Sequence, residues 1–271
     1  MGYVSTERRS GFYFEVIPAD MRDAYLSDAR PWIVGFSGGK DSTMVVQFVY
    51  YMLANLPPGD RQKQVYVLAS DTRVETPAIS GRIRRELDSL AAAAERDKLP
   101  ISTHIVYPKL NDTFWVNLIG RGYPSPTALF RWCTDRLRIR PVSEFIRNAV
   151  SRSGSVVVVL GARRQESATR ARAMRARVIE NQRFRPHTDL SNAWVYTPIE
   201  AVTTNDVWLY LLQAPSPRGG RQPRSGHPVQ TRRRRRMPPR HRHVHAVLCP
   251  QPVWLLDMHG GGKRPLTGGP S

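Results

Sequence analysis

The residues best suited to chemistry lie in one glycine-rich stretch, Gly35-Phe36-Ser37-Gly38-Gly39-Lys40-Asp41-Ser42, which we call the phosphate loop. It falls between a strand expected at 32–36 and a helix expected at 42–56. Glycines at such a junction let successive backbone N–H groups turn toward one anion, and the positive N-terminus of the following helix adds to the attraction. Position and composition therefore predict a binding site for nucleotide phosphates.

The side chains of the phosphate loop suit the same purpose. Ser37 and Ser42 offer hydroxyl donors, Lys40 offers a cation, and Asp41 offers a carboxylate that holds the loop or helps to place Mg²⁺. The spacing differs from the G-x-x-x-x-G-K-[ST] of P-loop kinases, so transfer of a γ-phosphate is not expected. The alternative is that the two central glycines only make a tight turn between strand and helix.

Two more polar motifs follow predicted strands. Residues 70–77, Ser-Asp-Thr-Arg-Val-Glu-Thr-Pro, follow a strand expected at 65–69, and residues 160–167, Leu-Gly-Ala-Arg-Arg-Gln-Glu-Ser, begin where a strand expected at 155–160 ends. Ligands of open α/β sheets bind at the carboxyl ends of strands, so we expect both motifs beside the phosphate loop. A third motif, at 130–141, lies between them in the sequence.

Short β-branched runs alternate with amphipathic stretches from Trp32 onward. This alternation predicts an α/β fold with a parallel, Rossmann-like sheet and helices on both faces. The run at 155–160 is mostly valine, which is typical of a strand buried on both faces. The other strands are expected at 101–107 and 194–199, and the other helices at 77–98, 142–150 and 205–212.

The composition changes at about residue 214. The formal charge is +19, yet residues 214–271 hold 12 lysines and arginines against one acid, whereas residues 1–213 hold 29 against 21. No apolar periodicity survives beyond 214, and we expect a disordered basic tail there. The expected organisation is an N-terminal segment packed on the core at 1–30, an α/β domain at 31–213 and the tail at 214–271.

The chain shows no targeting or membrane signal. It has no run of eighteen apolar residues, and residues 1–21 lack the apolar stretch of a secretory signal. Its two cysteines, Cys133 and Cys249, make no disulfide framework. We therefore expect a cytoplasmic protein without a membrane span.

The hexapeptide Ser37–Ser42 resembles the signature of the PP-loop ATP pyrophosphatase superfamily. That resemblance implies a fold of the adenine nucleotide α-hydrolase type, in which the loop binds ATP or a related adenylyl nucleotide. The motifs at 70–77, 130–141 and 160–167 resemble the phosphoadenosine phosphosulfate reductase family.

Two further segments narrow the resemblance. Residues 30–35 and 114–124, together with Arg131-Trp132-Cys133-Thr134, resemble the sulfurtransferases of DNA phosphorothioation (Dnd) systems, and the similarity runs from about residue 20 to 213. It implies an enzyme that uses ATP and Mg²⁺ to activate a DNA backbone phosphate, so that sulfur replaces a non-bridging oxygen. The implied partners are a cysteine desulfurase as sulfur donor, other DNA phosphorothioation subunits, and DNA.

The resemblance also implies roles for individual residues. Catalytic roles fall to Lys40, Asp41, Arg163 and Glu166. The nucleotide-binding residues are Ser37, Gly38, Gly39, Lys40, Asp41, Ser42, Asp71, Thr72, Gly161 and Arg163.

Outside the nucleotide site, Arg136 and Arg138 are implied to face phosphate or DNA, and Cys133 to be one thiolate ligand of a 4Fe–4S cluster. Simpler alternatives exist. Arg163 could be a surface cation. Glu166 could pair with Arg170 four residues on. Cys133 could be a small buried apolar residue.

The basic tail has a second interpretation, as translation in a shifted reading frame. When the last two bases of each codon are read with the first of the next, Met237 and Met258 must give cysteine, and Leu248 and Leu255 give cysteine if they use CTG. Four such cysteines suit a cluster site and resemble the end of the Dnd sulfurtransferases. The chain as written would then have an absent or incomplete cluster, and we expect it to bind nucleotide without full sulfur-transfer activity.

Two other functions stay open from the sequence. One is a phosphoadenosine phosphosulfate reductase, which acts on a small sulfonucleotide. The other is a non-catalytic DNA-binding protein that uses the five arginines at 232–236, because such a charge run binds phosphate in a salt-sensitive way.

Overall fold

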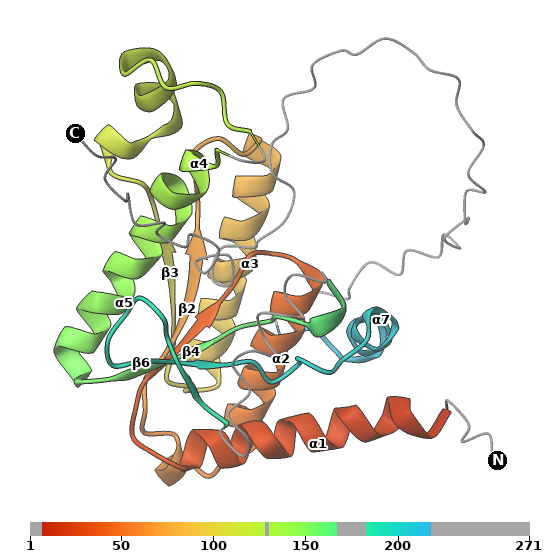
Figure 1. The fold of residues 1–271 in the computed structure, drawn as a ribbon. Helices are drawn as coiled ribbons and strands as arrows, with labels where there is room; N and C mark the ends of the chain where they lie inside the picture. The colour runs from red at the N-terminus through yellow and green to blue at the C-terminus, as the bar shows by residue number, and fades with distance from the viewer. Residues whose placement is uncertain (1–6, 128–129, 167–182, 218–271) are drawn as a thin grey trace, which may run out of the picture.

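The computed structural model describes residues 7–127, 130–166 and 183–217, with side chains described from residue 15 onward and Glu166 described by its backbone alone. A six-stranded sheet forms the centre, in the order β3-β2-β1-β4-β6-β5. All neighbouring strands are parallel except β5, which runs antiparallel to β6. The expected α/β fold with a mostly parallel sheet is confirmed (Figure 1). The strands are β1 Trp32–Gly35, β2 Val65–Ser70, β3 Ile101–Val106, β4 Val156–Val159, β5 Arg185–Pro186 and β6 Ala193–Tyr196.

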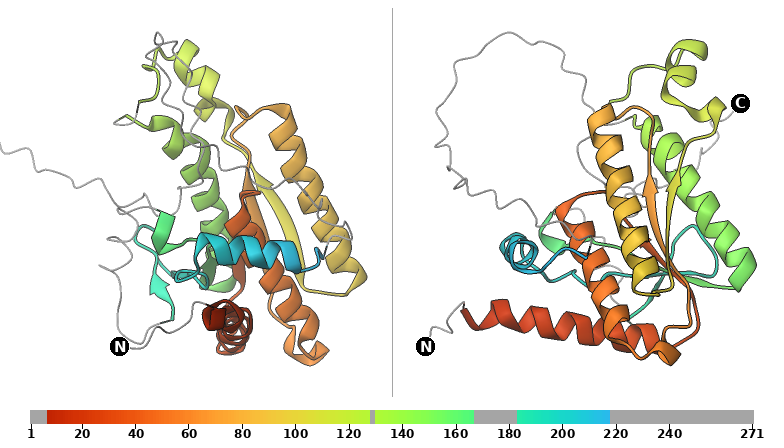
Figure 2. Two further views of the ribbon diagram at one scale, coloured as in Figure 1. Left: turned by 90° about the vertical axis from the view of Figure 1, so that its right-hand side faces the viewer. Right: turned by 180° about the vertical axis from the view of Figure 1, so that it is seen from behind.

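Helices cover both faces of the sheet, as expected (Figures 1 and 2). Side chains from α1, α2, α3 and α7 form one buried apolar cluster with one face of the sheet, and α5 packs on the other face. All four valines of β4 are buried, which confirms a strand covered on both sides. The longer helices are α1 Glu7–Leu26, α2 Lys40–Asn55, α3 Pro77–Arg96, α5 Arg140–Ser153 and α7 Thr204–Gln213.

Helix α1 was not expected from the sequence. It carries a proline at Pro18 and charged residues throughout, so its apolar stripe is weak. Met21, Ala24 and Tyr25 nevertheless lie buried against the core, and the Tyr25 hydroxyl donates to the backbone oxygen of Lys63 at 2.9 Å. Tertiary packing therefore stabilises a helix that local sequence indicates poorly.

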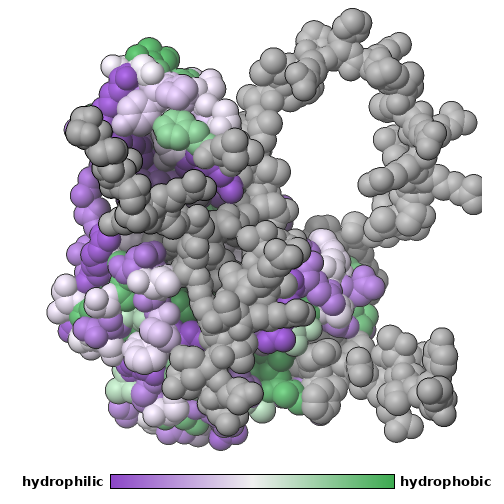
Figure 3. Space-filling model, viewed as in Figure 1, coloured by the Kyte–Doolittle hydropathy of each residue, from purple (hydrophilic) through white to green (hydrophobic). Residues whose placement is uncertain are grey.

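The segment between β3 and α5 is irregular and projects beyond the carboxyl ends of β2 and β3 (Figures 1 and 2). Its short turns are η2 Leu110–Asp112, η3 Val116–Gly120, α4 Trp132–Thr134 and η4 Asp135–Ile139, of which η3 and η4 are π-helical. Two other short turns lie outside this segment, η1 Pro58–Asp60 after α2 and η5 Arg164–Glu166 after β4. Its outer surface exposes Leu110, Trp115 and Ile119 by 74, 57 and 75%, and apolar colour marks the top of the molecule there (Figure 3).

The direction of the chain through the sheet reverses between β1 and β4. From β1 the chain moves outward to β2 and β3, then returns to pair β4 with the other side of β1. The carboxyl ends of β1 and β4 therefore flank the topological switch point, where open α/β sheets bind ligands. Among the helices in the described ranges, none has both the length and the apolar character needed to cross a bilayer.

Candidate nucleotide site

The phosphate loop lies at this switch point, between the end of β1 and the start of α2. Hydrogen bonds within the loop fix its shape. The Ser42 hydroxyl donates to the Gly39 carbonyl at 3.0 Å and accepts from the Ser37 amide at 3.2 Å. The two serine Oγ atoms are 3.1 Å apart. The hydroxyls that the sequence offers as phosphate donors thus also hold the loop closed.

The two glycines of the loop serve different needs. Gly38 has φ of +70°, a left-handed conformation that strains other residues, and an added Cβ would lie 3.2 Å from Ile83 Cγ1 of α3. Gly39 is the N-cap of α2 and supplies no side-chain oxygen to it. The first backbone amides of α2 have no intrahelical acceptor, so they and the helix dipole can face an anion.

Asp41 is held by a buried ion pair with Arg163, from the motif after β4. Arg163 Nε donates to Asp41 Oδ1 at 2.7 Å and its Nη2 to Oδ2 at 3.4 Å. Asp41 is 8% exposed and Arg163 only 1%. Lys40, whose side chain is 28% exposed, places Nζ 3.1 Å from Asp41 Oδ2. Of the two uses the sequence leaves open for Asp41, the structure contains the one in which the carboxylate holds the loop.

Arg163 ties a third element to this point. Its Nη1 donates to the Thr204 hydroxyl at 3.0 Å and to the Val202 carbonyl at 3.5 Å, where α7 begins. The alternative that Arg163 is a surface cation is therefore wrong, because its guanidinium is enclosed and bonded on several sides. The described contacts make Arg163 the link between the phosphate loop and α7.

Gly161 allows the motif after β4 to reach the loop. A Cβ added there would lie 2.9 Å from the backbone carbon and oxygen of Asp41 and 3.0 Å from the Ser42 nitrogen. Real Cβ contacts are essentially never so short, and the atoms in the way belong to the backbone. The sequence implied a nucleotide-binding role for Gly161; the structure assigns it a close backbone approach, and its contact with nucleotide stays a prediction.

The motif after β2 is ordered by its own side chains. The Asp71 carboxylate accepts from the Arg73 amide at 2.8 Å, and the Glu75 carboxylate accepts from the Thr72 amide at 3.1 Å. The other oxygen of Glu75 accepts from Arg138 Nη2 at 3.0 Å. Asp71 and Thr72 thus lie at the same edge of the sheet as the phosphate loop, and their contact with nucleotide stays a prediction.

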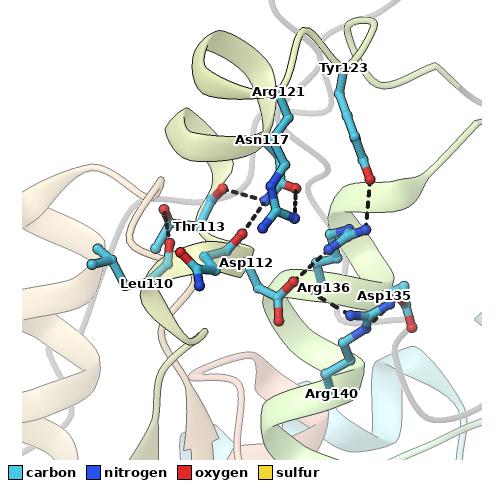
Figure 4. A network of polar contacts seen from close by, with 10 residues as sticks. Leu110, Asp112, Thr113, Asn117, Arg121, Tyr123, Asp135, Arg136 and Arg140 are labelled. Atoms are coloured by element: carbon cyan, nitrogen blue, oxygen red, sulfur yellow. Dashed lines mark hydrogen bonds and ion pairs between the residues drawn. The ribbon is translucent and has the colours of Figure 1, made fainter.

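Arg136 belongs to a network in the projecting segment (Figure 4). It donates to Asp112 Oδ1 at 2.6 Å and to the Tyr123 hydroxyl at 2.7 Å, while Arg140 reaches both Asp112 and Asp135. Arg136 and Arg138 each pair with a carboxylate of the protein, so these side chains fasten the segment. Their implied role toward phosphate or DNA stays a prediction.

Glu200 organises a further cluster that sequence reasoning missed. Its carboxylate accepts from Arg164 Nε at 2.6 Å and Arg185 Nη2 at 2.8 Å, and its backbone oxygen accepts from the Arg164 amide at 3.0 Å. Burial opposes ionisation of Glu200, but the two arginines outweigh it, so the pKa of this carboxyl falls below its ordinary value. Glu166, implied by the resemblance to be catalytic, ends the adjacent turn η5; its side chain lies outside the described residues, as does Arg170.

Cys133 lies in α4, partly exposed and unpaired in a disulfide. The alternative of a fully buried apolar residue does not fit that exposure. No group of three histidines, cysteines, aspartates or glutamates that could hold a metal occurs within the described ranges. A 4Fe–4S cluster commonly takes four thiolates, whereas the whole chain holds two cysteines. The residues of one chain therefore do not fit such a cluster, and Cys249 and the five arginines lie in the part the structure does not describe.

A parallel α/β sheet with a glycine-rich anion loop at its switch point defines the class of protein as a PP-loop nucleotide-binding fold. Residues 31–217 match the phosphoadenosine phosphosulfate reductase domain, and the chain belongs to that family. An uncharacterized protein of Methanocaldococcus jannaschii is 23% identical over 197 residues, which cover 73% of this chain and 34% of that protein. The chain thus spans about a third of the length of that relative.

Solved structures resemble the chain only distantly. They include a phosphoadenylyl-sulfate reductase from Candida auris in a phosphate complex (12% identity, TM-score 0.42, covering 78% of this chain and 87% of that one). A second is the U34-tRNA thiolase NcsA from Methanococcus maripaludis with its [4Fe-4S] cluster (13% identity, TM-score 0.44, covering 74% of this chain and 62% of that one). A third is the FMN adenylyltransferase from Candida glabrata with FMN and an ATP analogue (10% identity, TM-score 0.45, covering 78% of this chain and 60% of that one).

Proposed function

We propose that the chain is the ATP-dependent sulfurtransferase component of a DNA phosphorothioation system. ATP, with Mg²⁺, would adenylate a non-bridging oxygen of a DNA backbone phosphate and release pyrophosphate. Sulfur that a cysteine desulfurase supplies and a thiol reduces to the sulfide level would then displace AMP, which leaves with that oxygen. The single observation that supports activation most directly is the phosphate loop at the switch point, fixed by the buried Asp41–Arg163 pair. The motifs at 30–35, 114–124 and 131–134 support the DNA substrate.

In this proposal the residues of the loop divide two tasks. The amides at the start of α2 and the Lys40 ammonium would take the negative charge of the phosphates. Asp41 and Arg163 would hold those amides in one arrangement, since the pair is buried and joins the phosphate loop, the motif after β4 and the start of α7. Catalysis of phosphate chemistry depends mainly on such preorganised charge.

The sulfur step is not assigned to residues of this chain. A family sulfurtransferase with a 4Fe–4S cluster would need more thiolates than the two cysteines present. We therefore expect the activation half-reaction from this sequence without complete sulfur transfer, as the shifted-frame interpretation of the basic tail implies.

Exchange of radioactive pyrophosphate into ATP tests the activation step on the full chain, with and without duplex DNA. We expect exchange that depends on DNA and is lost in Lys40→Met. The matched control is Lys98→Met, which removes an exposed lysine just after the C-terminal end of α3. An exchange rate that is the same with and without DNA would refute DNA as the acceptor. ATP binding without any pyrophosphate exchange would refute activation by adenylation.

The family match favours one rival, a sulfonucleotide reductase. It would bind adenosine 3′,5′-bisphosphate more tightly than ATP and release sulfite in the presence of a thiol donor. The rival in which residues 232–236 make a non-catalytic DNA-binding protein predicts that removing 214–271 abolishes DNA binding. Our proposal predicts that DNA-dependent exchange survives that removal.

A further inference from the structure

Two arginines gather on one tyrosine at the carboxyl edge of the sheet, beside the phosphate loop. Tyr107 follows β3, Arg73 follows β2, and Arg84 lies in the second turn of α3. Arg73 Cζ is 5.1 Å from the centroid of the Tyr107 ring, and Arg84 Nη2 donates to the Tyr107 hydroxyl at 2.9 Å. Neither guanidinium forms an ion pair with a carboxylate in the described part of the chain.

This arrangement differs from that of three other arginines near this edge. Each of these forms an ion pair with a carboxylate of the protein: Arg136 with Asp112, Arg138 with Glu75 and Arg163 with Asp41. Arg73 and Arg84 are instead exposed and share a neutral ring. Two guanidinium groups that contact one ring, neither paired with a carboxylate within the described ranges, repel each other, so an anion bound near both would relieve the repulsion.

The backbone at Arg73 indicates that its position is imposed. Its φ of +60° is left-handed, which is uncommon for a residue with a side chain. The Asp71 carboxylate accepts from the Arg73 amide, and the Thr72 hydroxyl accepts from the Val74 amide, which together fix this turn. The turn directs the guanidinium of Arg73 over the Tyr107 ring.

The pair lies close to the predicted chemistry. Ile83, the residue before Arg84, is the neighbour that a Cβ on Gly38 would meet at 3.2 Å. β3 is two strands from β1, and strands lie about 4.8 Å apart, so Tyr107 is roughly 10 Å from the phosphate loop along the edge. A phosphate held there would be a neighbour of the one that reacts.

We propose that Arg73 and Arg84, joined on Tyr107, form a phosphate-binding site that holds the DNA backbone next to the activated phosphate. The assignment to DNA rests on the proposed function; the affinity for a phosphate ester does not. The other source of such a group is the 3′-phosphate of a small nucleotide, and the experiment separates the two.

The test measures how the affinity of the full chain for a labelled DNA duplex depends on salt concentration. Arg73→Asn removes the cation but tolerates the left-handed backbone, and Arg84→Gln removes the second cation. The control is Arg85→Gln, an exposed arginine one position along α3 that has no contact with Tyr107 among the described residues. Each lost phosphate contact lowers the slope of log affinity against log salt by about 0.9, even though the basic tail also binds DNA.

We expect a drop of about 0.9 in the slope for each variant and about 1.8 for the double variant, with unchanged ATP affinity and thermal midpoint. An equal drop in Arg85→Gln, or no drop in either test variant, would overturn the site. Weaker binding of adenosine 3′,5′-bisphosphate with an unaltered DNA slope would give the site to a small nucleotide and overturn the DNA assignment. Pyrophosphate exchange is scored separately, so a failed proposed function and a failed DNA site give different results.

Discussion

Gly161→Ala tests the close approach on which the geometry of the nucleotide site depends. The new Cβ would lie 2.9 Å from the backbone carbon and oxygen of Asp41, about 0.5 Å inside the 3.4 Å at which ordinary contact begins. The clash is between backbones, so it cannot be relieved by rotating a side chain. Overpacking of this kind costs about 1–3 kcal/mol, which for a domain of this size corresponds to a thermal midpoint lower by roughly 2–12 °C.

Gly59→Ala is the matched control for that change. Nothing lies within 4 Å of a Cβ added at Gly59, so alanine there should be neutral or stabilise by up to about 1 kcal/mol, because it restricts the unfolded chain. Calorimetric melting and ATP titration would be run on both variants. Gly161→Ala should also weaken ATP binding, since it displaces Asp41 and Ser42. Equal melting of the two variants would show that the loops yield at no cost, and the reasoning from close contact would fail.

Three further predictions concern buried polar groups. In urea unfolding, Arg163→Met should lower the free energy of unfolding by at most about 3–5 kcal/mol, because the buried Asp41 carboxylate keeps only Lys40 as an ion-pair partner among the described residues. Adding Asp41→Asn should recover part of that loss, and strictly additive losses would refute the coupling. Gln47 is fully buried, and its side-chain amide has no hydrogen-bond partner among the described residues. Gln47→Leu should therefore raise the free energy of unfolding by about 1 kcal/mol; a lower free energy of unfolding would contradict this. The pKa of Glu200 is lower in the folded state than its ordinary value of 4.5. Its ionised carboxylate therefore contributes fully to the free energy of unfolding above pH 4.5, and this contribution declines as the pH falls below that value. A difference in unfolding free energy between wild type and Glu200→Gln that stays constant down to about pH 3 would contradict this.

Local patterns predict most of the sheet and the phosphate loop. Valine-rich runs such as 156–159 leave few alternatives to a buried strand, and the glycine pair at 38–39 sits where strand gives way to helix. The helices α2, α3, α5 and α7 also lie where their apolar periodicity places them, with ends shifted by a few residues. These features depend on neighbours in the sequence, which is why they can be read from it.

Features that depend on distant residues are not visible in this way. Arg163 bonds to Asp41 across 122 positions, and no spacing rule connects them. The meeting of Arg73 and Arg84 on Tyr107 likewise follows from the order of strands and from one left-handed residue. The π-helical turns at 116–120 and 135–139 of the projecting segment are likewise not indicated by the sequence pattern.

The order of strands also has a consequence for how the chain is made. β1 pairs with β4 through Trp32 and Val157, which are 125 positions apart. A ribosome therefore releases β1, β2 and β3 well before the strand that completes the centre of the sheet, and non-local pairings of this kind form slowly. Until β4 emerges, one long side of β1 carries unsatisfied amides and carbonyls, which invite pairing with another nascent chain. We expect a lower rate of expression to reduce inclusion bodies, because fewer chains with an unpaired β1 edge are then present together.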